Sequence, residues 1–247
     1  MTLRSAVPTP GSRGARAFVV LRWPLGLVRV GWRYLWRITP VHRTEEPGGP
    51  EDLPEAVPAE LCDDQIQTVE DGVGALLHRR YSVLAADATV APSDIVAGLM
   101  NEPNWGTPGD MAVFVKTLGA PGEMAVGDEY VVRMPGPWNG PVRVIARTAT
   151  SYRLATLRGH LEAGQIEFRA TTVGSDLCFE IEAWARPGDW FSHLLYNRVR
   201  LAKEVQLNLW TETCLRVVAR SGGRRRGGVN VHTRRLADHT CGQHLPA

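Results

Sequence analysis

The sequence predicts an α+β fold in which a curved antiparallel sheet wraps around a long C-terminal helix. Six short segments between residues 111 and 185 alternate apolar with polar residues and are separated by Gly, Pro and Asp, as is typical of antiparallel strands. Residues 188–219 then repeat apolar side chains at helical spacing for about eight turns. Because such a helix must bury its apolar stripe, we expect it on one face of the sheet.

Composition divides the 247 residues into three regions. Residues 1–60 contain a basic segment rich in Arg and Trp, followed by a linker rich in Pro and Glu, and residues 61–219 form the predicted domain. Residues 220–247 are rich in Gly, Arg and polar side chains, so we expect this basic tail to be disordered.

The predicted domain starts with a strand and a helix. The strand covers residues 74–85 and the helix covers residues 91–103, with Ser93 as its N-cap and Pro103 at its end. Six further strands are predicted at residues 111–118, 129–134, 141–149, 151–157, 164–172 and 176–185. If the sheet residues beneath the helix at 188–219 are small, a cavity for a ligand remains between the two.

Charge is segregated along the chain, although the net charge is only +2. Residues 1–43 hold eight Arg and no acid, residues 220–235 hold six Arg and no acid, and residues 44–219 carry a net charge of −11. An acidic body argues against a specific nucleic-acid partner, whereas basic tails suit weak contact with an anionic membrane surface.

The aromatic residues of the N-terminal region allow two interpretations. Trp23, Trp32, Tyr34 and Trp36 are interleaved with Arg, so this segment could lie on a membrane surface as a basic amphipathic element. The alternative is a strap that docks on the domain, because folding normally buries such large apolar side chains. Arg and Pro interrupt the apolar run at 17–32, so we expect no membrane-spanning helix.

The cysteines point to a reducing compartment. Cys62, Cys178, Cys214 and Cys241 are scattered without a CxxC pair, which argues against a zinc knuckle and against a disulfide framework. Since no secretory signal is visible either, we expect a cytoplasmic protein. No metal site, nucleotide-binding loop or other cofactor site is predicted.

The stretch GQIEFRATTVGSDLCFEIEAW (164–184) predicts a hairpin with a defined register. The residues at 174–175 suit the two-residue loop of a type II′ turn, and pairing residue 173 with residue 176 places Glu167 opposite Glu182. Facing carboxylates repel each other unless a cation or a shared proton intervenes. The candidate cations are Arg153, Arg158 and Arg169. The pair is therefore either part of a solvated polar ladder on the convex face or an acid/base pair.

His160 and Glu162 form an H-x-E motif at the mouth of this hairpin. Zinc deaminases share this spacing but also need a P-C-x-x-C motif, which the sequence lacks. We therefore expect a turn histidine fixed by hydrogen bonds to the backbone. A ligand entering at this rim would have its polar end held by Arg158, His160 and Glu162.

Three stretches resemble the DUF1990 family of bacteria and plants: ATLRGHLEAGQIEFRA (155–170), FEIEAWARPGD (179–189) and LLYNRVRLAKEVQLNLW (194–210). The family motif usually reads TLPGHPExGEExF, so the sequence departs from it at Leu161 and Gln165. The stretch VGDEYVVRMPGPWNGPVRV (126–144) resembles an actinobacterial branch. The resemblance covers about residues 65–219 and implies a START/Bet v 1-like helix-grip fold with a small-molecule cavity.

Three functions are compatible with this sequence. The first is a module that binds a small apolar molecule, with ligand-binding residues Trp138, Arg158, His160, Glu162, Glu167, Glu182 and Gln206. In it, Trp138 is a lid or a packed plug, and Gln206 faces the cavity from the long helix. The second is an enzyme on the same scaffold with Glu167, Glu182 and His160 as acid/base groups. The third is a peripheral membrane protein that uses the Arg/Trp segment.

Overall fold

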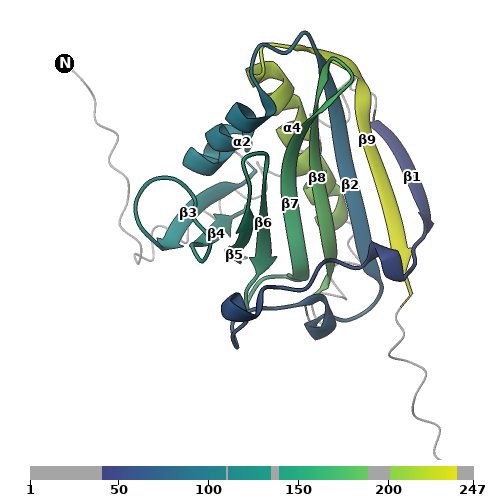
Figure 1. Ribbon diagram of the computed structural model, residues 1–247. Coiled ribbons are helices and arrows are strands. Elements are labelled where there is room, and N and C mark those ends of the chain that lie inside the picture. The colour runs from purple at the N-terminus through teal and green to yellow at the C-terminus, as the bar shows by residue number, and fades with distance from the viewer. Residues whose placement is uncertain (1–40, 110, 135–138, 189–200, 238–247) are drawn as a thin grey trace, which may run out of the picture.

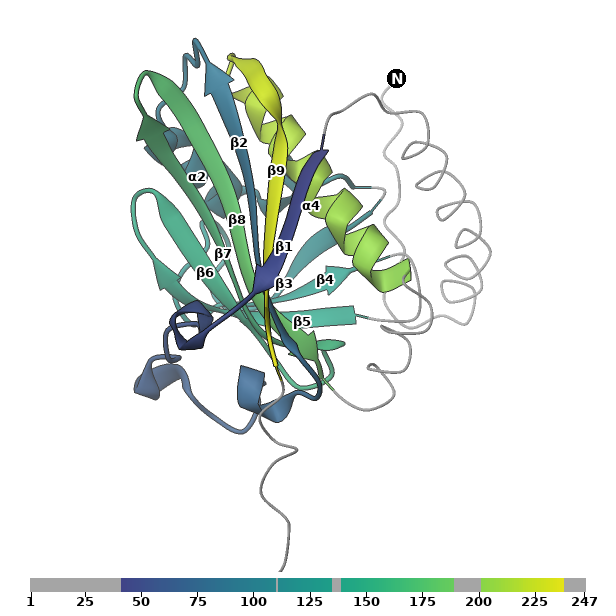
Figure 2. The ribbon, with the colours of Figure 1, turned by 90° about the vertical axis from the view of Figure 1, so that its right-hand side faces the viewer.

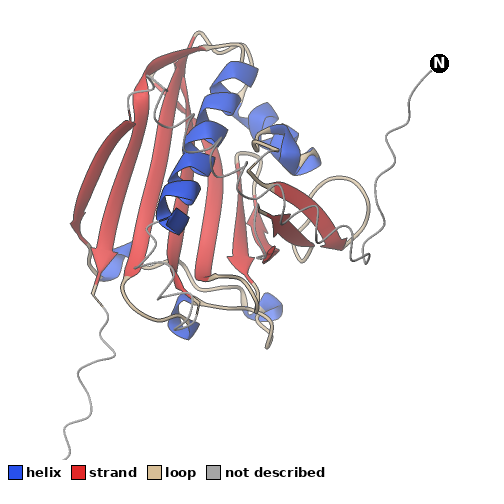
Figure 3. Cartoon of the chain, turned by 180° about the vertical axis from the view of Figure 1, so that it is seen from behind, coloured by secondary structure: helices blue, strands red, loops and turns tan. Residues whose placement is uncertain are grey.

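A computed structural model describes residues 41–109, 111–134, 139–188 and 201–237. The strands are β1 (Val41–Pro47), β2 (Leu76–Ala86), β3 (Val113–Leu118), β4 (Glu129–Arg133), β5 (Asn139–Arg147), β6 (Ser151–Thr156), β7 (Glu162–Val173), β8 (Asp176–Pro187) and β9 (Arg224–Leu236). The helices are α2 (Pro92–Asn101) and α4 (Leu201–Arg220), with short 3-10 turns η1 (Pro50–Asp52), η2 (Ala59–Leu61), η3 (Val69–Asp71) and η4 (Pro103–Trp105). Both α-helices lie on one face of the sheet, here called the inner face (Figures 1 and 3).

All nine strands form one sheet in the order β1-β9-β2-β8-β7-β6-β5-β4-β3. The α+β class and the large sheet are thus confirmed, but the sheet is mixed and not antiparallel throughout. The difference lies at β1, which pairs in parallel with β9, from Val41 opposite Val229 to Pro47 opposite Arg235. Figure 2 shows β2, β9 and β1 side by side at this edge.

The core lies between the inner face and the two helices. One cross-strand row consists of Tyr152, Phe168, Ile181, Tyr81 and Val231, all of them buried. The rings of Tyr152 and Phe168 stack with centroids 4.8 Å apart, and α4 covers Phe168 with the edge of Trp210 at 5.5 Å. Each such side chain contributes about 1.5–3 kcal/mol on burial, so this row fixes the position of α4 over the sheet.

The region after α4 differs most from the prediction, because residues 224–236 form a central strand and not a disordered tail. The strand alternates: Val229 and Val231 are buried toward the core, while its Arg side chains are largely exposed. Some of these arginines form ion pairs; for example, Arg226 lies 2.9 Å from the carboxylate of Asp176. The described helix is therefore followed by a strand and is not the last element.

Helix α2 confirms the predicted helix but starts differently. Its N-cap is Ala91, and Pro92 occupies the first helical turn, where a missing backbone N–H costs nothing. Ser93 lies inside the helix and does not cap it. The buried side chains of α2 face the inner side of the sheet near β6 and β7.

Residues 48–74, here called the covering segment, cross the other face of the sheet at one end, in front of the strands in Figure 1. Two apolar clusters hold the segment: Ile66 packs with Ile145, Ala155 and Leu157, and Val69 packs near Leu76, Trp184 and Leu236. Residues 41–60 are thus part of the same folded unit as the predicted domain. Trp23, Trp32, Tyr34 and Trp36 lie outside the described residues.

Candidate functional site

The predicted register of the β7–β8 hairpin is confirmed, with Val173 opposite Asp176 and Glu167 opposite Glu182. Gly174 has a φ of +62°, and Ser175 is not among the described residues with positive φ, as a type II′ turn requires. The two carboxylates point to the outer face, away from α4. They are only 7% and 5% exposed because the covering segment lies over them, so the expectation of a solvated ladder is wrong.

Arg153 forms an ion pair with Glu167. The guanidinium of Arg153 donates through Nη2 to Glu167 Oε2 at 2.7 Å and through Nη1 to Glu55 Oε2 at 2.8 Å. Glu55 belongs to the covering segment, so Arg153 joins that segment to β7. Its guanidinium also lies 5.6 Å from the ring of Trp184.

Glu182 has three side-chain partners, two of them arginines. Its carboxylate accepts hydrogen bonds from Arg80 Nη2 at 2.8 Å and Arg169 Nη2 at 2.5 Å, and it contacts His78 Nε2 at 2.8 Å. Burial alone would raise the pKa of this carboxyl, but the hydrogen bonds from His78 and Arg80 and the charges of Arg80 and Arg169 lower it to about 2. Glu182 is therefore ionised, and it shares no proton with Glu167.

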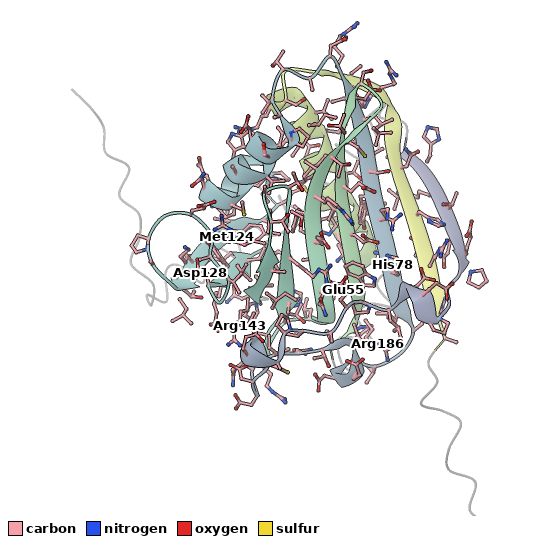
Figure 4. All side chains as sticks on the ribbon, viewed as in Figure 1. Glu55, His78, Met124, Asp128, Arg143 and Arg186 are labelled. Atoms are coloured by element: carbon pink, nitrogen blue, oxygen red, sulfur yellow. The ribbon has the colours of Figure 1, made fainter. Side chains whose placement is uncertain are left out.

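His78 connects this cluster to the covering segment. Its Nδ1 lies 2.9 Å from Asp52 Oδ1 while its Nε2 faces Glu182, and its ring stacks on Trp184 with the ring centroids 5.1 Å apart. Figure 4 labels His78, which belongs to β2. Burial opposes ionisation of Asp52, but hydrogen bonds from the Gly49 backbone and from His78 lower its pKa overall.

Replacing His78 by Phe is expected to loosen the covering segment. The Phe ring can still stack on Trp184 but forms no hydrogen bond, so Asp52 and Glu182 lose their contacts with His78, which we expect to cost about 2 kcal/mol of unfolding free energy. Hydrogen exchange at residues 48–56 should become faster. His232→Phe is the matched control, because His232 is more exposed and lies 3.4 Å from Glu46. Equal exchange in both variants would contradict this role of His78.

The inner face carries a second polar cluster, formed by Arg79, Gln206 and Glu162. Arg79 Nη1 on β2 donates to Gln206 Oε1 on α4 at 3.1 Å, and Gln206 Nε2 donates to Glu162 Oε2 on β7 at 2.9 Å. The neighbouring phenol of Tyr81 is fully buried, which raises its pKa to about 12 despite the charge of Arg79. These groups lie on the side of the sheet that faces α4.

The strands around this inner cluster carry small side chains. Arg79 lies opposite Ala183, which lies opposite Ile166, and Gly164 lies two positions before Ile166 on β7. Ile166 and Met134 pack against the core yet stay partly exposed, although their neighbours in the core are buried. Small residues beside partly exposed apolar ones make this end of the inner face the part best suited to receive a ligand.

His160 is the turn histidine that the sequence predicts. Its Nδ1 accepts a hydrogen bond from the backbone N–H of Glu162 at 2.9 Å, and its ring packs against Gly140. Burial lowers the pKa of His160 to about 4, against the effect of its hydrogen bond to the backbone of Glu162, so the ring is neutral at pH 7.

The structure brings some predicted site residues together and separates others. Glu162 and Gln206 meet on the inner face, whereas Glu167 and Glu182 lie on the outer face and so cannot act with them. Arg158 is exposed and donates through Nε to the carbonyl of Asp64 in the covering segment. Trp138 lies outside the described residues.

Sequence reasoning missed Arg79. The alternation of side chains in β2 could have found it. Leu77, Tyr81 and Val83 are apolar and two or four residues apart, so Arg79 lies on the same side of the strand as they do. A charged residue at an inward position of a strand is unusual enough to suggest a site.

The described elements define an α+β protein with one large sheet whose inner face is covered by helices. The sequence model of the family described as "Domain of unknown function (DUF1990)" matches residues 104–233, which is more than half of the chain. The chain belongs to the DUF1990 family. The match includes most of β9, beyond the end at residue 219 that the sequence resemblance suggested.

Solved structures with related folds share little sequence with this chain. The KanY protein has 9% identity and a TM-score of 0.43, over 62% of this chain and 99% of its own. A hypothetical protein of Helicobacter pylori has 11% identity and a TM-score of 0.42, over 57% and 86%. Norcoclaurine synthase of Thalictrum flavum has 12% identity and a TM-score of 0.38, over 57% and 89%. Curated protein sequences give no significant match.

Two negative findings apply to the described part of the chain. None of its helices is both long and apolar enough to cross a membrane. No group of three or more His, Cys, Asp or Glu side chains there is arranged to hold a metal ion.

Proposed function

We propose that this protein binds a small, mainly apolar molecule between α4 and the inner face of the sheet, as a helix-grip protein. The observation that carries the proposal is the polar chain Arg79–Gln206–Glu162 set into an otherwise apolar inner face. Ligand sites typically combine apolar walls with a few polar groups that fix orientation. Here Ile166 supplies apolar wall and the cluster supplies the polar end.

The polar character of this cluster, whose three residues are partly buried beside the core, supports a binding role. Placing a guanidinium and a carboxylate beside a core has a desolvation cost that apolar residues would avoid, and such pairs rarely add net stability. Their presence beside the core is therefore better explained by recognition of a ligand than by folding. An acid/base role for Glu167 and Glu182 is not part of the proposal, because arginines hold both carboxylates on the opposite face.

Two further assignments rest on sequence features. We propose a cytoplasmic location, which the absence of disulfides among the described cysteines supports: Cys62, Cys178 and Cys214 are free. Contact of the basic residues 1–40 with anionic membranes stays a prediction, because those residues lie outside the described part.

Native mass spectrometry of the purified protein tests the proposal. We expect a bound species of small mass that dissociates on collisional activation, together with micromolar binding of 1-decanol followed by Trp fluorescence. Ile166→Trp should fill the space beside Ala183 and abolish both signals without unfolding the protein. Val173→Trp is the control, because Val173 is exposed at the hairpin tip. Absence of both signals in the wild-type protein would overturn the proposal.

A further inference from the structure

Strand β1 lies at one end of the nine-stranded sheet, so no described strand pairs with its second side. We propose that a second copy of this chain pairs there, with the two β1 strands antiparallel and Thr44 facing Thr44 on a two-fold axis. The sheets of the two copies then join into one continuous sheet across the dimer. This contact uses the edge of the sheet and not its inner face, so it does not depend on the proposed ligand.

The order of charges in β1 is self-complementary in this arrangement. The strand reads VHRTEEP, and pairing Thr44 with its copy sets Arg43 opposite Glu45, both of them exposed. Facing opposite charges stabilise a pair of strands, whereas a parallel pairing in register sets like charges opposite each other. A guanidinium has five N–H donors, so Arg43 can bind the partner's Glu45 in addition to its contacts within its own chain.

The backbone of β1 has the direction that this pairing needs. The N–H of Gly48 donates to the carbonyl of Arg235 on β9 at 2.9 Å, and successive residues of a strand direct their N–H and C=O groups to opposite sides. By this alternation, the backbone groups of Arg43 and Glu45 point away from β9. Two such residues that face each other in an antiparallel pair exchange both hydrogen bonds. Thr44 lies between them, where side chains approach most closely and Thr–Thr pairs are favourable.

The opposite end of the sheet is protected against such pairing. There the side chain of Asn104 accepts a hydrogen bond from the N–H of Phe114 on β3 at 2.7 Å and donates one to its carbonyl at 2.9 Å. The register of β3 and β4 also shifts between Lys116 and Leu118. A blocked backbone and an irregular register both discourage the addition of a strand. β1 pairs with β9 in a regular register along its described length, so its edge is the better template.

The contact is small and polar, so we expect a weak dimer. Residues 42–47 include no large apolar side chain, and Pro47, which lacks an N–H, faces Val41 and removes one hydrogen bond at each end of the pairing. Permanent dimers have larger and more apolar interfaces. We therefore expect a dissociation constant on the order of 100 µM.

Sedimentation equilibrium of the full chain, from about 10 µM to about 1 mM, tests the pairing. We expect Glu45→Arg to weaken the dimer at least about tenfold, because it sets Arg opposite Arg twice. Arg43→Glu should weaken it to a similar extent by setting Glu opposite Glu. An equimolar mixture of the two variants should dimerise about as tightly as the wild-type protein, because each chain carries the charge that the other needs.

Thr44→Cys provides a second readout. The two-fold axis brings the two introduced thiols together, so mild oxidation should link the chains. Glu46→Cys is the matched control, because its two thiols lie on opposite sides of the axis and should give only the background from the native cysteines. Circular dichroism of each variant confirms that it is folded.

The proposal makes the dimer, its edge and its register separately testable. Wild-type protein that stays monomeric over the whole concentration range overturns it and is the result expected if another segment of the chain occupies the β1 edge. A dimer that Glu45→Arg leaves unchanged overturns it by placing the contact elsewhere. A mixture of the two charge variants that stays monomeric, or equal linking of Thr44→Cys and Glu46→Cys, overturns the antiparallel register.

Discussion

Gly164→Ala is expected to prevent the protein from folding stably. Gly164 has a φ of +149°, and a Cβ built there would lie 1.9 Å from the carbonyl oxygen of Trp184 on the neighbouring strand. The obstacle is backbone, which cannot rotate away, so β7 and β8 would have to separate locally. We expect a loss of more than about 4 kcal/mol, a large part of the stability of an ordinary domain. Urea denaturation followed by circular dichroism measures it.

Gly159→Ala is the matched control, since it changes the other glycine of the same RGHLEAG stretch. Gly159 also has a positive φ, +93°, but no atom lies within 4 Å of the added Cβ. Only the backbone conformation opposes this substitution, at about 1–2 kcal/mol. Similar losses for the two variants would show that the strands can adjust and that the close approach at Gly164 is not decisive.

Glu182→Gln is expected to cost about 3 kcal/mol of unfolding free energy at pH 7. The lowered pKa of Glu182, about 2 against an ordinary 4.5, means that the folded state favours the ionised carboxylate. A lowered carboxyl pKa adds stability that is complete above the unfolded value near 4.5 and disappears as pH falls toward 2. The difference in unfolding free energy between the wild-type protein and the variant should therefore become smaller as the pH falls from 4.5 toward 2. Chemical denaturation at pH 7, 4 and 2.5 measures it.

The control for Glu182→Gln is Glu180→Gln, measured at the same three pH values. Glu180 is more exposed and its contact with Arg80 is 3.9 Å long, so we expect a change of less than about 0.5 kcal/mol at any pH. A loss in Glu182→Gln that stays constant from pH 7 to pH 2.5 would contradict the ionised state of Glu182 and favour a loss of packing.

Local rules predicted the β7–β8 hairpin in full. A two-residue turn at 174–175 fixes the register, and every partner from Val173–Asp176 down to Glu167–Glu182 then follows by counting. Counting along the hairpin could not predict which residues lie over Glu167 and Glu182. Burial of Glu167 and Glu182 depends on the covering segment, about 100 residues earlier in the chain, and no local pattern indicates that contact.

Strands β9 and β1 were missed for a related reason. β9 reads as a Gly/Arg-rich tail because its exposed positions carry arginines, and only Val229 and Val231 mark its inward side. β1 is nearly all exposed, so its sequence shows no apolar alternation at all. Its position depends on backbone pairing with β9, which side-chain patterns do not reveal.

The position of β9 between β1 and β2 also sets the order in which the chain can fold. While the ribosome is still making the protein, β2 can pair with β8 but keeps one open edge until residues 224–236 emerge. β1, made first among the described strands, has no place in the sheet until that moment. Such distant pairings fold slowly, and an unpaired edge invites aggregation. We therefore expect nascent chains that stop before β9 to depend on chaperones, and completion of the sheet to coincide with the synthesis of its last strand.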